Sequence, residues 1–303
     1  MPAQPRSKEV PDRPRLLGTS TPEVDAQRRL NALNQRRMRP TLYPVMSDAA
    51  SELADRQLEE RFLAEERAAV RPLIAHVPDD PGGFVDWFEE LRDSGPGQGD
   101  PLFPWLAEDA SRDQMRWFLG QEVAGEAGFE DLLALTQLRM PARAKLEMAR
   151  NYWDELGRGR ASGMHGAMLD SLATALDVRL AVEQIEWPAL ALANLMVAMA
   201  WQRHLAFQAV GALGIIELTA PGRAEKVNAG LVRLGVAGEA RRYFALHATL
   251  DVRHSRAWND EVIRPLIAED PRRARAIAEG ALLRLRAGAR CFAAYRRHFL
   301  GAC

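Results

Sequence analysis

Residues 247–254 read His247-Ala248-Thr249-Leu250-Asp251-Val252-Arg253-His254, with reactive side chains at i, i+4 and i+7. On an α-helix this spacing places all three side chains on one face, because 3.6 residues complete one turn. Two imidazoles and a carboxylate on one face are suitable ligands for a borderline transition metal such as iron, manganese or zinc. A solvated polar helix face explains the same pattern, so the interpretation depends on the rest of the chain.

The composition predicts an all-α protein. Ala, Leu, Arg and Glu are abundant, β-branched residues never alternate over a useful length, and 47% of the 303 residues are hydrophobic. The formal net charge of −1 leaves no basic excess for binding nucleic acid. The N-terminal residues lack the apolar segment of a signal peptide, and Cys291 and Cys303 form no CxxC pair, so we expect a cytoplasmic protein.

Three regions are expected along the chain. Residues 1–45, rich in proline and arginine, predict a flexible or draped arm with a short helix at 30–37. Residues 46–109 predict an N-terminal helical extension, and residues 110–303 predict a helical bundle. The bundle helices are expected at 112–140, 142–156, 164–176, 187–218, 223–234, 239–267 and 271–299. The apolar run 187–210 is interrupted by charge near its end, which favours a buried core helix over a membrane span.

Three more residues have the chemistry of metal ligands. Glu155 ends a predicted helix and a glycine-rich turn follows, so the chain can return His165 to the same place ten residues later. Glu217 follows the most apolar helix of the chain. A carboxylate buried there needs a partner, which a metal ion or an arginine provides.

Three glutamates share one stripe of the helix expected at 112–140, namely Glu122, Glu126 and Glu130. If the chain folds back at Pro141, Glu126 lies near the level of Glu155 and provides a further ligand or accepts a hydrogen bond from a ligand histidine. A salt-bridged surface explains the stripe equally well. The remaining histidines have no such neighbours and are interpreted as structural or surface residues: His76, His204 and His298.

The order and spacing of six residues resemble the ligand pattern of the haem-oxygenase-like di-iron oxidases and oxygenases, a family of iron-containing redox enzymes. The six are Glu155, His165, Glu217, His247, Asp251 and His254. The resemblance covers about residues 110–300 and implies a haem-oxygenase-like seven-helix bundle with a central small-molecule pocket. It also implies two iron ions in place of haem, with O2 as co-substrate.

The resemblance also implies a division of the ligands between the two irons: Glu155, His165 and His254 for one, His247 and Asp251 for the other, and Glu217 between them. Some family members that oxidise nitrogen use a further carboxylate, for which Glu126 or Glu122 would be the counterpart. No dinucleotide-binding or P-loop motif is present, so the electrons are expected from an external reductase or chemical reductant.

The activity that we expect first is N-oxygenation of an amine or amino acid, and the second is oxidative C–C cleavage or desaturation of an amino acid or fatty acid. Apolar residues are expected to exclude water from the oxidant or simply to pack the core: Met115, Phe129, Met196, Met199 and Phe244. The arginines that could neutralise a substrate carboxylate are Arg203, Arg223 and Arg253.

Two other classes of protein fit the same pattern. In a non-catalytic helical interaction protein, the His and Glu stripes would be solvated and bind no metal. A cofactorless pyrroloquinoline-type oxidase of the same fold would not need Glu155, Glu217 and Asp251 together. No nucleic acid or membrane partner is expected, and homodimerisation through exposed apolar helices is left open.

Overall fold

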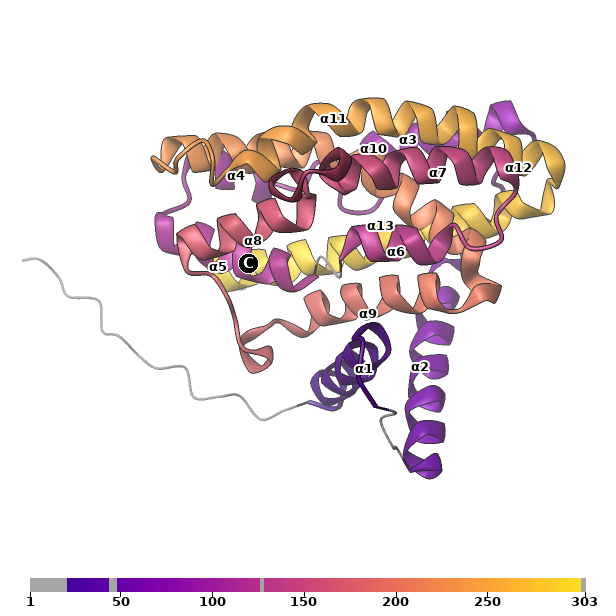
Figure 1. Cartoon of the computed structure of the whole chain (residues 1–303), viewed down its shortest axis with the longest axis horizontal. Helices are drawn as coiled ribbons and strands as arrows, with labels where there is room; N and C mark the ends of the chain where they lie inside the picture. Colours follow the sequence, from indigo (N-terminus) through magenta and orange to yellow (C-terminus); the bar gives the residue numbers. More distant parts are fainter. Residues whose placement is uncertain (1–20, 44–47, 126–127, 301–303) are drawn as a thin grey trace, which may run out of the picture.

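The computed structural model describes residues 21–43, 48–125 and 128–300 (Figure 1). This part of the chain forms helices and contains no strand, which confirms the predicted all-α class. The N-terminal helices are α1 (Pro22–Met38), α2 (Ala49–Val70), α3 (Pro81–Ser94) and α4 (Leu102–Glu108). The bundle helices are α5 (Arg112–Gly125), α6 (Phe129–Thr136), α7 (Ala142–Glu155), α8 (His165–Leu176), α9 (Trp187–Trp201), α10 (Ala206–Arg233), α11 (Arg242–Trp258), α12 (Arg264–Glu269) and α13 (Arg272–Leu300).

The first helix is longer than the short helix expected at 30–37. It begins at Pro22, because the Thr21 hydroxyl accepts a hydrogen bond from the Val24 amide and proline is favoured in the first turn. α1 lies along α9, where the Asn34 amide donates to Asn194 over 3.0 Å in a buried contact. α2 projects away from the bundle (Figure 1). The part of the expected arm at 1–20 lies outside the described residues.

The helix expected at 112–140 is interrupted. Ser111 and Gln114 form the predicted reciprocal capping pair at the start of α5. α5 ends at Gly125, and α6 starts after Gly128, whose φ of 70° is incompatible with a right-handed helix. Glu126 falls in the gap at 126–127, outside the described residues, so its predicted role stays a prediction.

The apolar helix expected at 187–218 is also wrong in its limits. A 3-10 turn at Arg203–Leu205 separates α9 from α10. α10 then continues through Pro221, where the sequence predicted an end, to Arg233. Since Pro221 has no amide hydrogen, the Glu217 carbonyl receives no i+4 hydrogen bond, and helical bonding is interrupted at a candidate metal ligand.

The segment Arg203–Arg233 is long and apolar enough to cross a membrane, with a mean hydropathy of 1.3. Its most apolar window is 72% buried inside the protein, as expected for the central helix of a bundle. The expected helix at 239–267 is likewise divided, because a π-helical stretch at Asn259–Ile263 lies between α11 and α12. Such stretches are frequent at functional sites.

α10 packs against α4, α11 and α13, and its contact with α13 depends on two glycines. A Cβ atom on Gly211 would lie 1.8 Å from the Ile277 carbonyl oxygen, and one on Gly280 would lie 1.8 Å from the Gln208 carbonyl oxygen. The two helix backbones therefore touch at this crossing. No larger residue fits without separating the helices.

Replacing Gly211 with alanine is expected to lower the free energy of unfolding by roughly 1–3 kcal/mol, because the added methyl group forces α10 and α13 apart. Gly222→Ala on the same helix is the control. No described atom lies within 4 Å of its Cβ position, so a gain of about 0.5–1 kcal/mol is expected. Chemical denaturation followed by circular dichroism measures both variants, and equal stability would contradict the close crossing.

Candidate metal centre

A tight glycine turn joins Glu155, the last residue of α7, to His165, the first of α8. Gly157 has a φ of 60°, and a Cβ atom there would lie 2.2 Å from the Gly163 carbonyl carbon. This approach, with a bridge between Leu156 and Met164, returns the chain to its starting point. Glu155 Oε2 consequently lies 2.7 Å from His165 Nδ1, with both side chains buried. The structure therefore places these two predicted ligands together.

α11 presents its three predicted ligands towards the same interior space. Asp251 and His254 are buried, and the half-buried ring of His247 lies 4.6 Å from the ring of His165. His247 Nδ1 is 2.7 Å from the Tyr243 carbonyl oxygen, which can only accept a hydrogen bond. His247 thus carries its proton on Nδ1 and has a free lone pair on Nε2.

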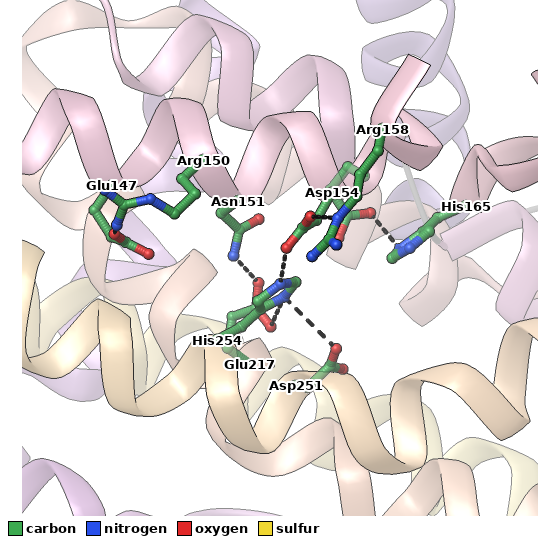
Figure 2. A network of polar contacts seen from close by, with 10 residues as sticks. Glu147, Arg150, Asn151, Asp154, Arg158, His165, Glu217, Asp251 and His254 are labelled. Atoms are coloured by element: carbon green, nitrogen blue, oxygen red, sulfur yellow. Dashed lines mark hydrogen bonds and ion pairs between the residues drawn. The ribbon is translucent and has the colours of Figure 1, made fainter. Parts of the chain in front are cut away.

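Glu217 reaches the other end of the same space from α10 (Figure 2). Its Oε2 is 3.5 Å from His254 Nδ1, and Asp251 Oδ1 is 4.0 Å from the same nitrogen. The Asn151 amide, one turn before Glu155 on α7, donates to Glu217 Oε1 over 2.7 Å. Asn151 therefore fixes the direction in which this carboxylate points.

Asp154 orients His254 from the opposite side. Its Oδ2 is 3.1 Å from His254 Nε2, while Arg158 donates to its Oδ1 over 2.6 Å. Although burial opposes ionisation, Arg158 and His254 lower the pKa of Asp154, so it accepts the Nε2 proton as a carboxylate. Asn151, Asp154 and Arg158 were not predicted from the sequence as site residues, and only their position within about one turn of Glu155 points to them.

The candidate ligands form two groups that share one carboxylate. The ligand atoms of each group lie within 4.8 Å of one another: Glu155, His165 and His247 in one, and Glu155, Glu217 and His254 in the other. Asp251 adjoins the second group through His254. This grouping differs from the expected division, because His247 and not His254 lies beside His165. The two histidines are seven residues apart, about 10 Å along α11, and α8 begins at the level of the first.

The electrostatics of this space favour a bound cation. Burial and the nearby Glu217 hold the pKa of Glu155 well above its usual range. Burial lowers the pKa of His165 and His247 to about 4, so both rings are neutral, with unprotonated nitrogen available for a metal. The Nδ1 atoms of His165 and His254 are buried and face carboxylate oxygens, at 2.7 Å from Glu155 and 3.5 Å from Glu217. Carboxylates that repel one another beside buried imidazole nitrogens fit a transition-metal site.

The additional carboxylates considered from the sequence lie in different places. Glu130 lines a cavity of about 400 Å³ together with Glu155 and His165, and its charge contributes to the raised pKa of Glu155. Glu122 instead lies among arginines at the far end of another cavity, where Tyr295 contacts it. Glu130 is therefore a better candidate for an extra ligand than Glu122.

The three arginines that the sequence suggested for binding a substrate carboxylate lie in different surroundings. Arg203 donates to the carbonyl oxygens of Leu135 and Leu138 and thus stabilises the end of α6. Arg253 is exposed on α11. Arg223 alone of the three lines the cavity that contains the candidate ligands.

Asp154→Asn is expected to weaken Fe(II) binding about 10- to 100-fold, because the amide is a poorer acceptor for the His254 proton. Asp170→Asn is the matched control, since Asp170 is exposed and pairs with the exposed Arg179. Anaerobic titration against a competing chelator measures both affinities. Wild-type affinity in the Asp154 variant would show that this carboxylate does not orient the ligand.

Comparison with known proteins gives this arrangement a family. A family model described as iron-containing redox enzyme matches residues 116–289, which include all six candidate ligands. No curated protein matches the chain. Among solved structures, a CADD-like protein of unknown function from Nostoc punctiforme aligns with 79% of this chain and 97% of its own, at 15% identity and a TM-score of 0.49. Because the family match spans more than half of the sequence, the chain belongs to the iron-containing redox enzymes and is an oxidoreductase.

Proposed function

We propose that the chain is a non-haem di-iron, O2-dependent oxidase or oxygenase acting on a small organic substrate. The observation that carries this proposal is the pair of buried ligand groups that share Glu155. One iron would be held by Glu155, His165 and His247, and the second by Glu217, Asp251 and His254, with Glu155 common to both. Two ferrous ions bound there would supply electrons for the reduction of O2. An external donor would have to restore those electrons after each turnover.

The chain's own residues prepare this site in three ways. Asp154 and the Tyr243 carbonyl oxygen fix the orientation of His254 and His247. The Gly157–Gly163 contact fixes the position of Glu155 relative to His165. Apolar side chains, including Phe129 and Phe244, line the adjoining cavity and exclude water from it. Other apolar residues that the sequence suggested for this role belong to the packed core: Met115, Met196 and Met199.

Within this class we favour N-oxygenation of an amine or amino acid. Nitrogen-oxidising enzymes of the resembled family use a further carboxylate, and Glu130 lies in a cavity with Glu155 and His165. Oxidation at carbon, giving C–C cleavage or desaturation of an amino acid, is the second candidate. A long fatty acid is disfavoured, since the cavity at the ligands measures about 120 Å³.

The test of the di-iron site is the iron content of the anaerobically reconstituted chain, with two Fe(II) expected for each wild-type molecule. Asp251→Ala is expected to lose at least one iron and nearly all substrate-dependent O2 consumption, because one of the carboxylates of the second group is removed. His204→Ala, which removes an exposed histidine, is the control and should keep both. If the wild-type protein binds no iron, the result would favour the non-catalytic interaction protein. Unchanged iron and O2 consumption in Asp251→Ala would favour the cofactorless oxidase.

A further inference from the structure

A cavity of about 120 Å³ extends from the candidate metal ligands into the bundle. At one end it is bounded by Glu155, Glu217, His247 and Asp251. Arg223, about 9 Å beyond Glu217 along α10, lines the same cavity with Glu122 and Arg284, which lie close enough to shift its pKa. We call this part of the cavity the arginine end, and the metal site uses none of these three side chains. The walls between the two ends are largely aromatic and aliphatic. Charged groups in such a cavity require compensation from a partner or from a ligand.

Arg223 is held in place by aromatic rings and one hydroxyl, with no ion pair to another residue in the part of the chain that the structure describes. It lies six residues after Glu217 on α10, about 9 Å further along the helix. Its Cζ lies 5.7 Å from the centre of the Phe292 ring and 6.0 Å from that of Phe103. Within residues 21–43, 48–125 and 128–300, its guanidinium donates one hydrogen bond, to the hydroxyl of Thr219 over 3.1 Å. A guanidinium has five N–H donors, so most of its donors remain available to a ligand.

Arg284 approaches the same place from α13. A Cβ atom on Gly288 would lie 2.9 Å from its Nη1, so this glycine leaves room for the guanidinium. Arg223 and Arg284 repel each other, and burial together with this repulsion lowers the pKa of Arg223 to about 10. At neutral pH Arg223 therefore remains charged.

Glu122 balances one of these two charges from a distance. It lies within electrostatic range of both arginines, and Tyr295 contacts it. Within the described ranges, however, no carboxylate oxygen lies within 4 Å of a nitrogen of Arg223 or Arg284. Burial raises the pKa of Glu122, so this carboxyl offsets at most one of the two positive charges and the arginine end keeps a net positive charge. A single carboxylate on a ligand would neutralise it.

We propose that Arg223 and Arg284 bind the carboxylate of the substrate, and that the substrate is a compact monocarboxylic acid whose reacting end faces the metal ligands. The binding of a carboxylate is inferred from the arginine pair, whereas the direction of the reacting end rests on the proposed function. The planar guanidinium forks match the two oxygens of a carboxylate. An amine on the acid would lie at the opposite end, because the charge at the arginine end is already neutralised by the carboxylate.

The size of the cavity restricts the acid further. A cavity of about 150 Å³ accommodates benzene, so 120 Å³ suits a ligand of about six non-hydrogen atoms. A surface cleft of about 550 Å³ shares Phe103, Glu217 and Arg223 with the inner cavity. We therefore expect the substrate to enter the inner cavity through this cleft.

Butyrate and butyramide are the probes, since they have the same size and differ in charge. Calorimetric titration of the metal-free full-length chain is expected to show butyrate binding about 10- to 100-fold more tightly than butyramide. Arg223→Gln and Arg284→Gln should each weaken butyrate binding by a similar factor and leave butyramide unchanged. Arg275→Gln, an exposed arginine on α13, should bind butyrate as the wild type does.

A fourth variant tests the proposal even if the arginine variants fold poorly. Glu122→Gln removes the competing carboxylate, so it is expected to bind butyrate several-fold more tightly than the wild type. Equal affinity for the two probes, or weaker butyrate binding by Glu122→Gln, would overturn the proposal. These titrations use metal-free protein. If butyrate binding does not depend on the arginines while the protein still binds two irons, only the carboxylate site is rejected. Failure of iron loading rejects the di-iron function, and Arg-dependent butyrate binding still stands.

Discussion

Carboxylates buried inside a helical bundle need compensating positive charge, and this requirement organises the centre of the molecule. Glu155, Glu217 and Asp251 lie in a space with little water, where two of the three neighbouring imidazoles are neutral. Left alone, such carboxylates resist ionisation, as the raised pKa of Glu155 shows. Two bound iron ions, as proposed above, would supply this positive charge. The features around the site, including the orientation of His254 by Asp154 and of Glu217 by Asn151, then have a common purpose.

The helical class and the neighbourhood of the six ligands could be predicted from the sequence, because both depend on local patterns. The spacing of His247, Asp251 and His254 defines one helix face, and glycines at 157 and 163 predict a chain reversal next to Glu155. Which histidine lies beside which carboxylate could not be predicted. That pairing depends on the level at which α8 meets α11, and this level is fixed by long-range packing.

The errors in helix boundaries have a related cause. Pro221 is a common signal for a helix end, but burial of α10 between α4, α11 and α13 stabilises the helix beyond it. Gly128 gave no comparable warning, because glycine is tolerated within helices until tertiary structure imposes a positive φ. The position of Arg284 in the cavity could not be predicted either. Nothing in its local sequence distinguishes an arginine that faces a cavity from the many that face solvent.

The glycine crossing between α10 and α13 has a consequence for selectivity. Glu217 and Arg223 share α10, and Arg284 is carried by the helix whose backbone touches it at Gly211 and Gly280. The separation between the Cα atoms of Glu217, Arg223 and Arg284 is therefore restricted by two backbones in direct contact. In the proposed binding mode, this restricted spacing would limit the length of acid that the site accepts. It would discriminate between homologous acids by their length, rejecting a chain one methylene too long by collision and one too short by a reacting atom that falls out of reach.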